Sequence, residues 1–280
     1  DVQGGGSSVG VKSAGEGTVD IGMASREVSA EELEQYADMQ VHVIALDGIA
    51  IVVNPDVNVD DLTKDQVRDI FSGAITNWSE VGGEDKAIIV VSREEGSGTR
   101  AAFEEMVMGK EVVITDKAIL QPSNGAVRTT VSTTPDSIAY LSFGYLDASV
   151  KALKVDGVEP TEANAASHTY PIVRPLNLLT KGEPTGVVKA FLDYVLSDAG
   201  QAEVVADGYI KAPAEGAAAV VPTEAPAASL SGKIALAGST TIQPLAEKLS
   251  ESFRASNPDV TIDVQGGGSS VGVKSAGEGT

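Results

Sequence analysis

Short apolar runs alternate along the chain with segments in which apolar residues recur every three or four positions. The runs at residues 19–23, 41–53, 87–92, 233–237 and 260–264 predict strands. The periodic segments at residues 100–108 and 242–254, and one that begins near residue 30, predict helices. This alternation predicts an α/β fold of parallel sheets flanked by helices.

Two helix starts carry a recognisable polar signature. Ser29 precedes Glu32 by three residues, and Thr63 precedes Gln66 by the same interval. At this spacing the two side chains satisfy each other's free backbone N–H groups in a capping box. We therefore expect one helix to begin after Ser29 and another after Thr63.

The two ends of the chain carry the same sequence. DVQGGGSSVGVKSAGEGT stands at residues 1–18 and again at residues 263–280. Such self-similarity predicts either a cyclic permutation of an ordinary domain or a window cut from tandem copies.

Residues 212–231 are rich in Ala, Pro, Glu and Val without periodicity. We interpret them as a linker, which would span about 25 Å r.m.s. if flexible.

The composition argues against several classes of function. The chain has 280 residues and a net charge of −20, from 20 basic and 40 acidic side chains, which disfavours binding to nucleic acid or to an anionic membrane. It has no Cys, and its two His residues (His42 and His168) lie far apart, so metal and Cys/His nucleophile chemistry are improbable. The longest apolar run, residues 44–53, is too short to cross a bilayer. No signal peptide is visible, although a permuted or trimmed chain would have lost one.

Three turns share one pattern, in which a strand is followed by Gly with Ser or Thr and then by a helix. They lie at residues 237–241 (AGSTT), 4–8 (GGGSS, repeated at 266–270) and 95–99 (EGSGT). A helix N-terminus offers free N–H groups and a partial positive charge, and nearby hydroxyls add donors. Taken singly, each Ser or Thr is better explained as a helix N-cap. Taken together, the three turns predict a site for a small tetrahedral oxyanion.

Arg93 ends a predicted strand four residues before Ser97. There its guanidinium would donate charge-assisted hydrogen bonds to the same anion, with Glu95 holding it in place. A solvated surface pair of Arg93 and Glu95 is the alternative. We expect Arg26 to form a structural salt bridge, and Trp78 to pack in the core or between domains.

Catalytic motifs are missing from the sequence. The turn at residues 4–13 fails as a nucleotidase phosphate loop, because Val11 stands where lysine is required. No carboxylate pair and no Ser/His/Asp grouping can be assembled around either histidine. We therefore expect no chemical conversion of a bound ligand.

Seven stretches carry a family resemblance. In an order that begins after the linker, they are residues 238–244 (GSTTIQP), 3–12 (QGGGSSVGVK), 19–26 (VDIGMASR), 70–78 (IFSGAITNW), 93–99 (REEGSGT), 123–127 (SNGAV) and 191–197 (FLDYVLS). Together they strongly resemble the phosphate-binding proteins of phosphate ABC importers, the PstS type within the periplasmic-binding-protein superfamily. The resemblance covers nearly everything outside the linker.

The resemblance implies a two-lobed type II periplasmic-binding-protein fold, permuted in chain order and carrying the 18-residue terminal duplication. Residues 1–53 and 174–211 would form parts of lobe I, and residues 54–173 would form lobe II. Residues 232–280 would be the N-terminal portion of lobe I, belonging to the next repeat or to a swapped neighbour. The crossing strands would lie near residues 52–54 and 172–174.

The resemblance also implies a set of phosphate contacts. By turn, they are Thr240 and Thr241; Ser7 or its copy Ser269; and Arg93, Ser97, Gly98 and Thr99. The best-known members place an aspartate, which accepts the proton of hydrogen phosphate, where Ser25 stands here. A serine hydroxyl can accept that proton or donate its own, and it repels sulfate less than a carboxylate does. The choice between phosphate and other tetrahedral oxyanions is therefore open.

By the same resemblance, the chain is expected to be a solute-binding protein for phosphate uptake that needs no cofactor or metal and is not an enzyme. It would act in the periplasm or on the outer face of the cell membrane and deliver phosphate to the membrane permease of the importer.

The duplication supports a different hypothesis, because both copies of residues 1–18 cannot fill one slot in one lobe. The chain would then be the structural repeat unit of a head-to-tail extracellular filament or array, a homo-polymer.

Overall fold

The computed structural model describes residues 6–213 and 230–266. Most of the predicted linker, and Ser269 in the second copy of the repeat, lie outside the described residues. The helices are α1 (Ser7–Glu16), α2 (Ala30–Gln35), α3 (Lys64–Ser72), α4 (Gly98–Phe103), α5 (Asn124–Thr133), α6 (Glu162–Ala166), α7 (Gly186–Leu196), α8 (Asp198–Ala206) and α9 (Gln243–Ser256). The strands are β1 (Ile21–Ala24), β2 (Met39–Val53), β3 (Asp61–Leu62), β4 (Ile89–Arg93), β5 (Ile119–Gln121), β6 (Ser137–Ser142), β7 (Lys151–Ala152), β8 (Lys154–Val155), β9 (Val173–Lys181), β10 (Ile210–Lys211), β11 (Gly232–Gly238) and β12 (Val260–Gly266).

The helix boundaries follow the polar signatures of the sequence. Ser29 and Thr63 close capping boxes with Glu32 and Gln66 at the starts of α2 and α3, as predicted. The helix expected at residues 100–108 begins two residues earlier, and after Phe103 its second half continues as a π-helical turn at Glu104–Met108. In the part of the chain that the structure describes, no helix is long and apolar enough to cross a membrane.

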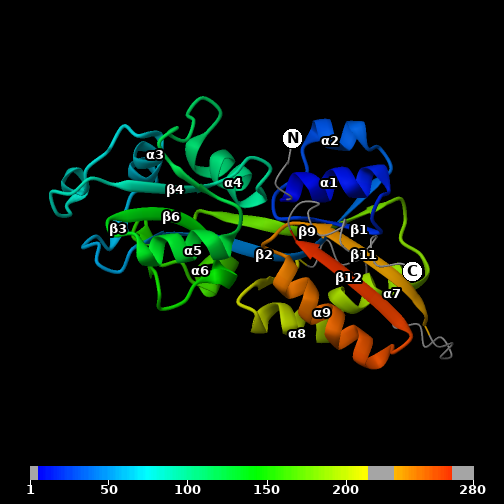
Figure 1. The fold of residues 1–280 in the computed structure, drawn as a ribbon. Coiled ribbons are helices and arrows are strands. Elements are labelled where there is room, and N and C mark those ends of the chain that lie inside the picture. The colour runs from blue at the N-terminus through cyan, green and yellow to red at the C-terminus, as the bar shows by residue number, and fades with distance from the viewer. Residues whose placement is uncertain (1–5, 214–229, 267–280) are drawn as a thin grey trace, which may run out of the picture.

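One continuous path of paired strands runs through the molecule in the order β12-β11-β1-β9-β2-β6-β4-β5. The pairs β11–β12, β1–β11, β4–β6 and β4–β5 are parallel, as the alternation of elements predicts. The prediction is wrong for the two longest strands, since β2 runs antiparallel to both β9 and β6. These strands cross between the two halves of the molecule, so each lies in a sheet with partners that run the other way (Figure 1).

The apolar core is divided between the two halves that β2 joins (Figure 1). Ile44 and Ala45 of β2 pack in one cluster with β11 and α9, whereas Ile49 to Val53 pack in the other with β6, α3 and α5. In the first half, α1 and α2 lie on one side of the sheet and α7, α8 and α9 on the other (Figure 1). The two halves therefore meet where β2 and β9 pass from one to the other (Figure 1).

The two copies of the repeat contribute different elements. Helix α1 is built from the first copy, whereas β12 ends in Asp263–Gly266 of the second copy. Strand β12 pairs in parallel with β11, which pairs with β1, directly after α1 in the chain. A strand from one copy and a helix from the other thus pack into the same lobe.

Candidate functional site

The Gly/Ser/Thr turns at three helix starts meet in the structure. Ser7 begins α1, Ser97 is the N-cap of α4, and residues 239–241 lead into α9. The Ser8 N–H donates to the Gly96 carbonyl at 3.2 Å, which joins the first turn to the second. Thr99 Oγ1 lies 3.2 Å from Thr241 Oγ1, which joins the second to the third. The three turns therefore form one cluster between the two halves of the molecule.

Buried hydroxyl groups form the centre of this cluster. Ser7, Ser25, Thr99, Ser239 and Thr241 are all at most 1% exposed. Ser25 Oγ lies 3.2 Å from Ser7 Oγ and accepts a hydrogen bond from Ser239 Oγ at 2.9 Å. A Cβ atom on Gly98 would overlap the hydroxyl oxygens of Ser7 and Ser25, so only glycine leaves this cradle open. A set of hydroxyls around a glycine, which has no side chain, suits a small anion that accepts hydrogen bonds.

Arg93 lies at the edge of the hydroxyl cluster, at the end of β4. Its side chain is 1% exposed and donates from Nη2 to Thr240 Oγ1 at 3.5 Å. The prediction that Glu95 holds the guanidinium is wrong, because the carboxylate of Glu94 does so. It accepts hydrogen bonds from Arg93 Nε at 3.2 Å and from Arg93 Nη2 at 2.9 Å. Because β4 ends at Arg93, the chain turns there, and the side chain of Glu94 lies against the guanidinium while Glu95 is exposed.

Three tyrosine hydroxyls form hydrogen bonds to the backbone of this cluster. Tyr145 donates to the Thr240 carbonyl at 2.7 Å, and Tyr209 donates to the Thr241 carbonyl at 3.1 Å. Tyr140 accepts from the Arg93 N–H at 3.3 Å, and burial raises its pKa to about 12. Burial also raises the pKa values of Tyr145 and Tyr209. All three phenols therefore stay protonated at neutral pH and remain hydrogen-bond donors.

A buried ion pair lies behind the hydroxyl cluster. Asp47 of β2 and Arg174 of β9 face each other in register, and Asp47 Oδ2 accepts from Arg174 Nε at 3.0 Å and from Nη2 at 2.8 Å. Arg174 also donates to Ser25 Oγ at 3.4 Å and to Thr241 Oγ1 at 3.2 Å. Burial raises the pKa of the Asp47 carboxyl, and the positive charge of Arg174 opposes that rise. The pair thus joins the crossing strands to the hydroxyls of two different turns.

The structure brings together the predicted residues Ser7, Ser25, Arg93, Gly98, Thr99, Thr240 and Thr241. Ser97 is buried beside them, but its Oγ accepts the Arg100 N–H at 3.3 Å, the N-cap role considered from the sequence. Sequence reasoning did not select Ser239, Asn124, Asp47 or Arg174. The first two lie inside stretches that carry the family resemblance, at residues 238–244 and 123–127, whereas neither of the last two stands in any motif.

The remaining conspicuous residues have structural roles. Arg26 forms a two-bond ion pair with Glu32, with both N···O distances at 2.7 Å, as predicted. Trp78 is buried in the core and donates to the Asp136 carbonyl at 3.0 Å. His42 lies 3.0 Å from Thr180 Oγ1, and burial lowers its pKa. Residues 6–213 and 230–266 contain no cluster of His, Cys, Asp or Glu suited to a metal ion.

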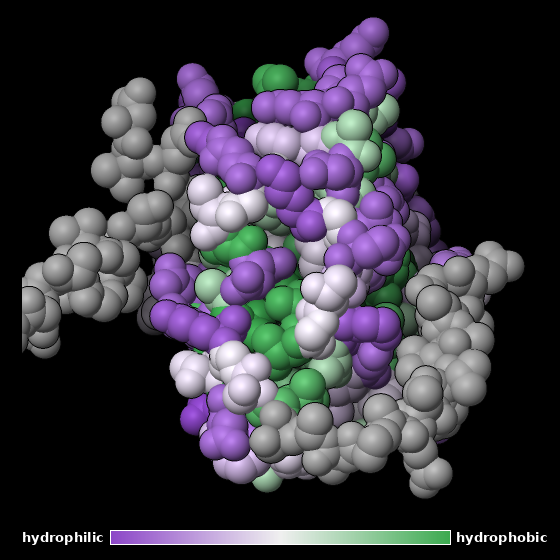
Figure 2. Space-filling view, turned by 90° about the vertical axis from the view of Figure 1, so that its right-hand side faces the viewer, coloured by the Kyte–Doolittle hydropathy of each residue, from purple (hydrophilic) through white to green (hydrophobic). Residues whose placement is uncertain are grey.

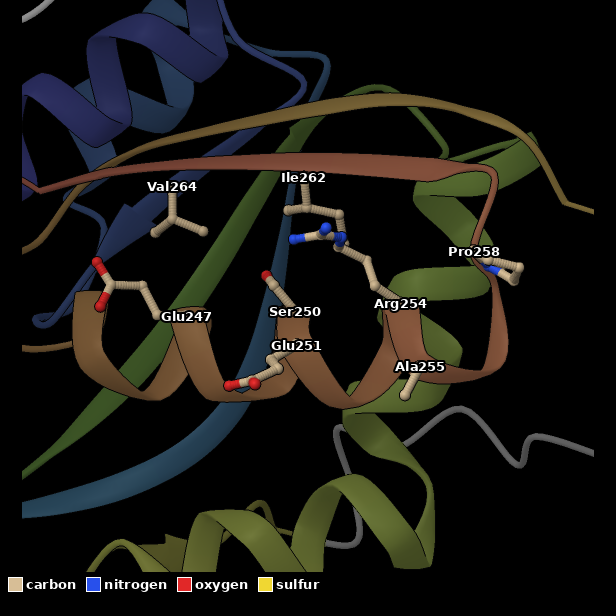
Figure 3. Close-up of a pocket in the computed structure, with 8 residues that line it drawn as sticks. All are labelled: Glu247, Ser250, Glu251, Arg254, Ala255, Pro258, Ile262 and Val264. Atoms are coloured by element: carbon tan, nitrogen blue, oxygen red, sulfur yellow. The ribbon is translucent and has the colours of Figure 1, made fainter.

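A second concave surface lies between α9 and β12. Hydrophobic residues gather near the centre of the face that Figure 2 shows, with hydrophilic residues around them. The groove has a volume of about 670 Å³, and its lining includes Ile262 and Val264 of β12 together with Glu247, Glu251 and Arg254 of α9 (Figure 3). Two carboxylates against one guanidinium repel anions, so the hydroxyl cluster is the better anion site.

Sequence comparison relates the chain to a known superfamily. The family described as the PBP superfamily domain matches residues 1–199. The phosphate-binding protein PstS of Bacillus subtilis is 42% identical over 214 residues, which are 75% of this chain and 70% of that protein. The phosphate-binding protein PstS of Borreliella burgdorferi is 31% identical over 217 residues, covering 73% and 77% of the two chains.

Comparison with solved structures gives a consistent result. A putative phosphate ABC transporter substrate-binding protein from Clostridium perfringens, with bound phosphate, is 43% identical with a TM-score of 0.72, over 74% of this chain and 85% of that one. An ABC-type phosphate transport receptor from Vibrio cholerae is 36% identical with a TM-score of 0.63, over 74% and 86%. Both likenesses extend over most of each chain.

Proposed function

The chain belongs to the PBP superfamily and, within it, to the PstS phosphate-binding proteins of ABC importers, and from this premise we propose that it captures one inorganic phosphate ion between its two halves. The observation that carries the proposal is the cluster of buried hydroxyls around Gly98, with Arg93 at its edge. In this proposal the ligands are Ser7, Ser25, Arg93, Ser97, Gly98, Thr99, Thr240 and Thr241. Donors of this kind bind an oxyanion without converting it.

The proposal extends to the biological setting. The chain would act as a solute-binding protein in the periplasm or on the outer face of the cell membrane and pass phosphate to the permease of an ABC importer. The names of its relatives, which describe binding and transport of phosphate, support this setting. One lobe would comprise residues 6–53, 174–211 and 232–266 and the other residues 54–173, joined by β2 and β9.

Calorimetry on protein stripped of bound ligand tests the proposal. Titration with inorganic phosphate should release or absorb heat with a stoichiometry of one ion per chain. Arg93→Met removes the only guanidinium that contacts Thr240 among the described residues and should weaken binding by about a hundredfold, since a charge-assisted contact contributes about 1.5–3 kcal/mol. Arg68→Met, on the exposed face of α3, is the matched control and should bind like the parent. Absence of any heat with phosphate in the parent protein would refute the proposal.

The duplicated sequence favours a second role that is compatible with the first. Residues 230–266 supply β11, β12 and α9 to the lobe that begins with α1. The same segment, supplied by a neighbouring copy, would complete that lobe with the same contacts. We propose that the chain can serve in this way as the repeat unit of a head-to-tail array, and the sequence identity of residues 1–18 and 263–280 supports it.

A further inference from the structure

The surface on which α1 lies, which we call the α1 seat, accepts only a helix with small residues at fixed positions. Helix α1 packs on β1, β9 and β11, and it buries Gly10, Ala14 and Gly15 there (Figure 1). A Cβ atom on Gly10 would overlap the Met23 carbonyl oxygen, and one on Gly15 would overlap the Tyr36 ring. The seat therefore selects a sequence with glycine at both positions.

A second segment of the chain has the same residues at the same spacing. Residues 269–278 (SSVGVKSAGE) repeat α1 letter for letter, so Gly272 matches Gly10 and Ser269 matches Ser7. This segment lies outside the described residues. Identical sequences make identical contacts in one seat. The two copies therefore compete for it on terms set only by the segments that connect each of them to the rest of the chain.

The connection of the second copy is short and begins beside the seat. Strand β12 ends at Gly266, which pairs in register with Gly238 of β11, and paired strands lie about 4.8 Å apart. Gly238 is in contact with α1, since a Cβ atom on it would lie 2.7 Å from Gly10 Cα. Only two residues separate Gly266 from Ser269, and that link spans up to about 10 Å. The α1 seat is therefore within reach of residues 269–278 while β12 stays in place.

Helix α1 can leave the seat without loss of the strand that follows it. Residues 17–20 separate α1 from β1. Strand β1 is fixed independently, by parallel pairing with β11 and antiparallel pairing with β9. Exchange of one copy for the other thus breaks the contacts of α1 alone, and the incoming copy makes the same contacts again.

We infer that the α1 seat is a binding site for residues 269–278 of the same chain, which exchange with residues 7–16 and bring Ser269 to the anion site in place of Ser7. The site is then complete with either copy of the repeat. The part of the inference that concerns Ser269 and the anion rests on the proposed function, whereas the exchange of helices does not depend on a ligand.

The variant Gly10→Val tests the exchange. Its side chain would overlap the Met23 carbonyl, so the first copy cannot take the seat, whereas the second copy, with Gly272 unchanged, can. Calorimetry should give a dissociation constant for phosphate within about tenfold of the parent value, and thermal unfolding should give a midpoint close to that of the parent. Gly272→Val is the matched control and should behave like the parent, because the first copy then fills the seat.

The double variant Gly10→Val, Gly272→Val leaves neither copy able to fill the seat. It should bind phosphate at least about a hundredfold more weakly than the parent and unfold at a lower temperature. The inference is overturned if Gly10→Val alone loses as much as the double variant or does not fold. Parent-like binding and stability of the double variant would also overturn it, since the seat would then not select glycine.

The ligand role of Ser269 is tested in the Gly10→Val background. Ser269→Ala should weaken phosphate binding there by about tenfold or more, because it removes a hydroxyl that donates to a charged ligand. Ser270→Ala is the control and should change nothing, since it matches Ser8 on the exposed side of α1. Unchanged affinity in the Ser269→Ala variant would overturn this part of the inference.

Light scattering on Gly10→Val shows which chain supplies the second copy. A mass of 28.7 kDa in dilute solution, together with parent-like phosphate binding, is the expected result. Phosphate binding found only in multimers would mean that a neighbouring chain fills the seat, and would overturn the inference. Absence of heat with phosphate in the parent would refute the proposed function alone, because the unfolding midpoints of the three glycine variants still decide the exchange.

Discussion

At the scale of single residues, the ion pair of Asp47 and Arg174 shows what a buried charge requires. Its side chains are 0% and 1% exposed, and removing two charges from water costs several kcal/mol per ion. Three kinds of contact offset that cost here. Arg174 Nε and Nη2 donate to Asp47, Arg174 Nη1 donates to the Ser25 carbonyl at 2.9 Å, and the Phe143 N–H donates to Asp47 Oδ1 at 3.2 Å.

Removal of one partner should therefore destabilise the protein more than removal of both. We expect Arg174→Met to lower the free energy of unfolding by about 3–5 kcal/mol, because it leaves the Asp47 carboxylate uncompensated. The double variant Asp47→Asn, Arg174→Met should recover most of that loss. Urea unfolding at neutral pH gives both values.

A surface pair gives the comparison. Lys189 and Asp193 of α7 lie one turn apart and are 56% and 38% exposed, so Lys189→Met should change the free energy of unfolding by about 0.5 kcal/mol at most. A double variant as unstable as Arg174→Met would contradict the explanation, since the loss would then come from packing and not from an unpaired charge.

The same residues show how far the sequence predicts the site. Ser7, Thr99 and Thr241 stand in turns that predict helix starts, and Ser25 was assigned to the site by the family resemblance. All four lie together in the structure, although their contact with phosphate stays a prediction. Arg174 could not be found in this way. It meets Thr241, 67 positions away, only because β9 crosses between the halves of the molecule. Sequence patterns report local structure and give no information on such contacts.

At the scale of elements, the first turn of α4 packs directly against the hydroxyl cluster. Gly98 and Thr99 follow the N-cap Ser97, and the backbone of Gly98 lies against Ser7 and Ser25 of the other half of the molecule. Gly98 has no positive φ, so alanine is allowed by its backbone. Only the space in the cluster excludes a side chain there.

We therefore expect Gly98→Ala to abolish or strongly weaken phosphate binding, by about a hundredfold or more, while the free energy of unfolding falls little. The added methyl group would hold the halves apart at the point where Ser7 and Thr99 must reach one ion. Calorimetry with phosphate and thermal unfolding measure the two effects.

Gly125 is the matched control, because it also lies in the first turn of a helix, α5. A Cβ atom there would meet Ser123 Oγ and Tyr145 Cε1 at 3.8 Å, which is ordinary contact. Gly125→Ala should bind phosphate like the parent and gain up to about 1 kcal/mol of stability from helix propensity. Parent-like phosphate binding by Gly98→Ala would show that the cradle around Gly98 is not the site.

Elements were easier to predict than their pairing. The capping boxes and apolar runs located α2, α3, α9, β11 and β12 within a few residues, because caps and periodicity are local properties. The antiparallel direction of β2 and β9 was missed. An apolar run of this length looks the same whether its neighbours run parallel or antiparallel, so the direction is set by the path of the chain between the halves.

At the scale of the whole molecule, residues 230–266 complete a lobe that the rest of the chain leaves open. Ile234 and Leu236 of β11, and Leu245, Leu249 and Phe253 of α9, are buried in the same cluster as Met23 and Phe191. β11 also pairs in parallel with β1. These contacts involve no residue between Pro213 and Leu230, so they are the same whether the segment belongs to this chain or to another copy.

In a closed monomer residues 230–266 pack in the lobe of their own chain, whereas in an exchanged multimer they pack in the lobe of a neighbour. Because the contacts are the same, the two forms should differ chiefly in the conformational entropy of the residues that connect this segment to the rest of the chain. A short tether gives an effective concentration of about a millimolar, so the closed monomer should dominate below that chain concentration and exchanged multimers should appear above it. Light scattering should then give 28.7 kDa in dilute solution and multiples of that mass after refolding at high concentration.

Shortening the connection provides the control for this prediction. Deletion of residues 214–229 should raise the multimeric fraction at low concentration, because a short hinge under strain favours exchange. Exchanged multimers should still bind one phosphate per chain, since each pair of lobes keeps one complete hydroxyl cluster. The mass of a single chain for both proteins at every concentration would contradict the array role, because residues 230–266 could then dock only within their own chain.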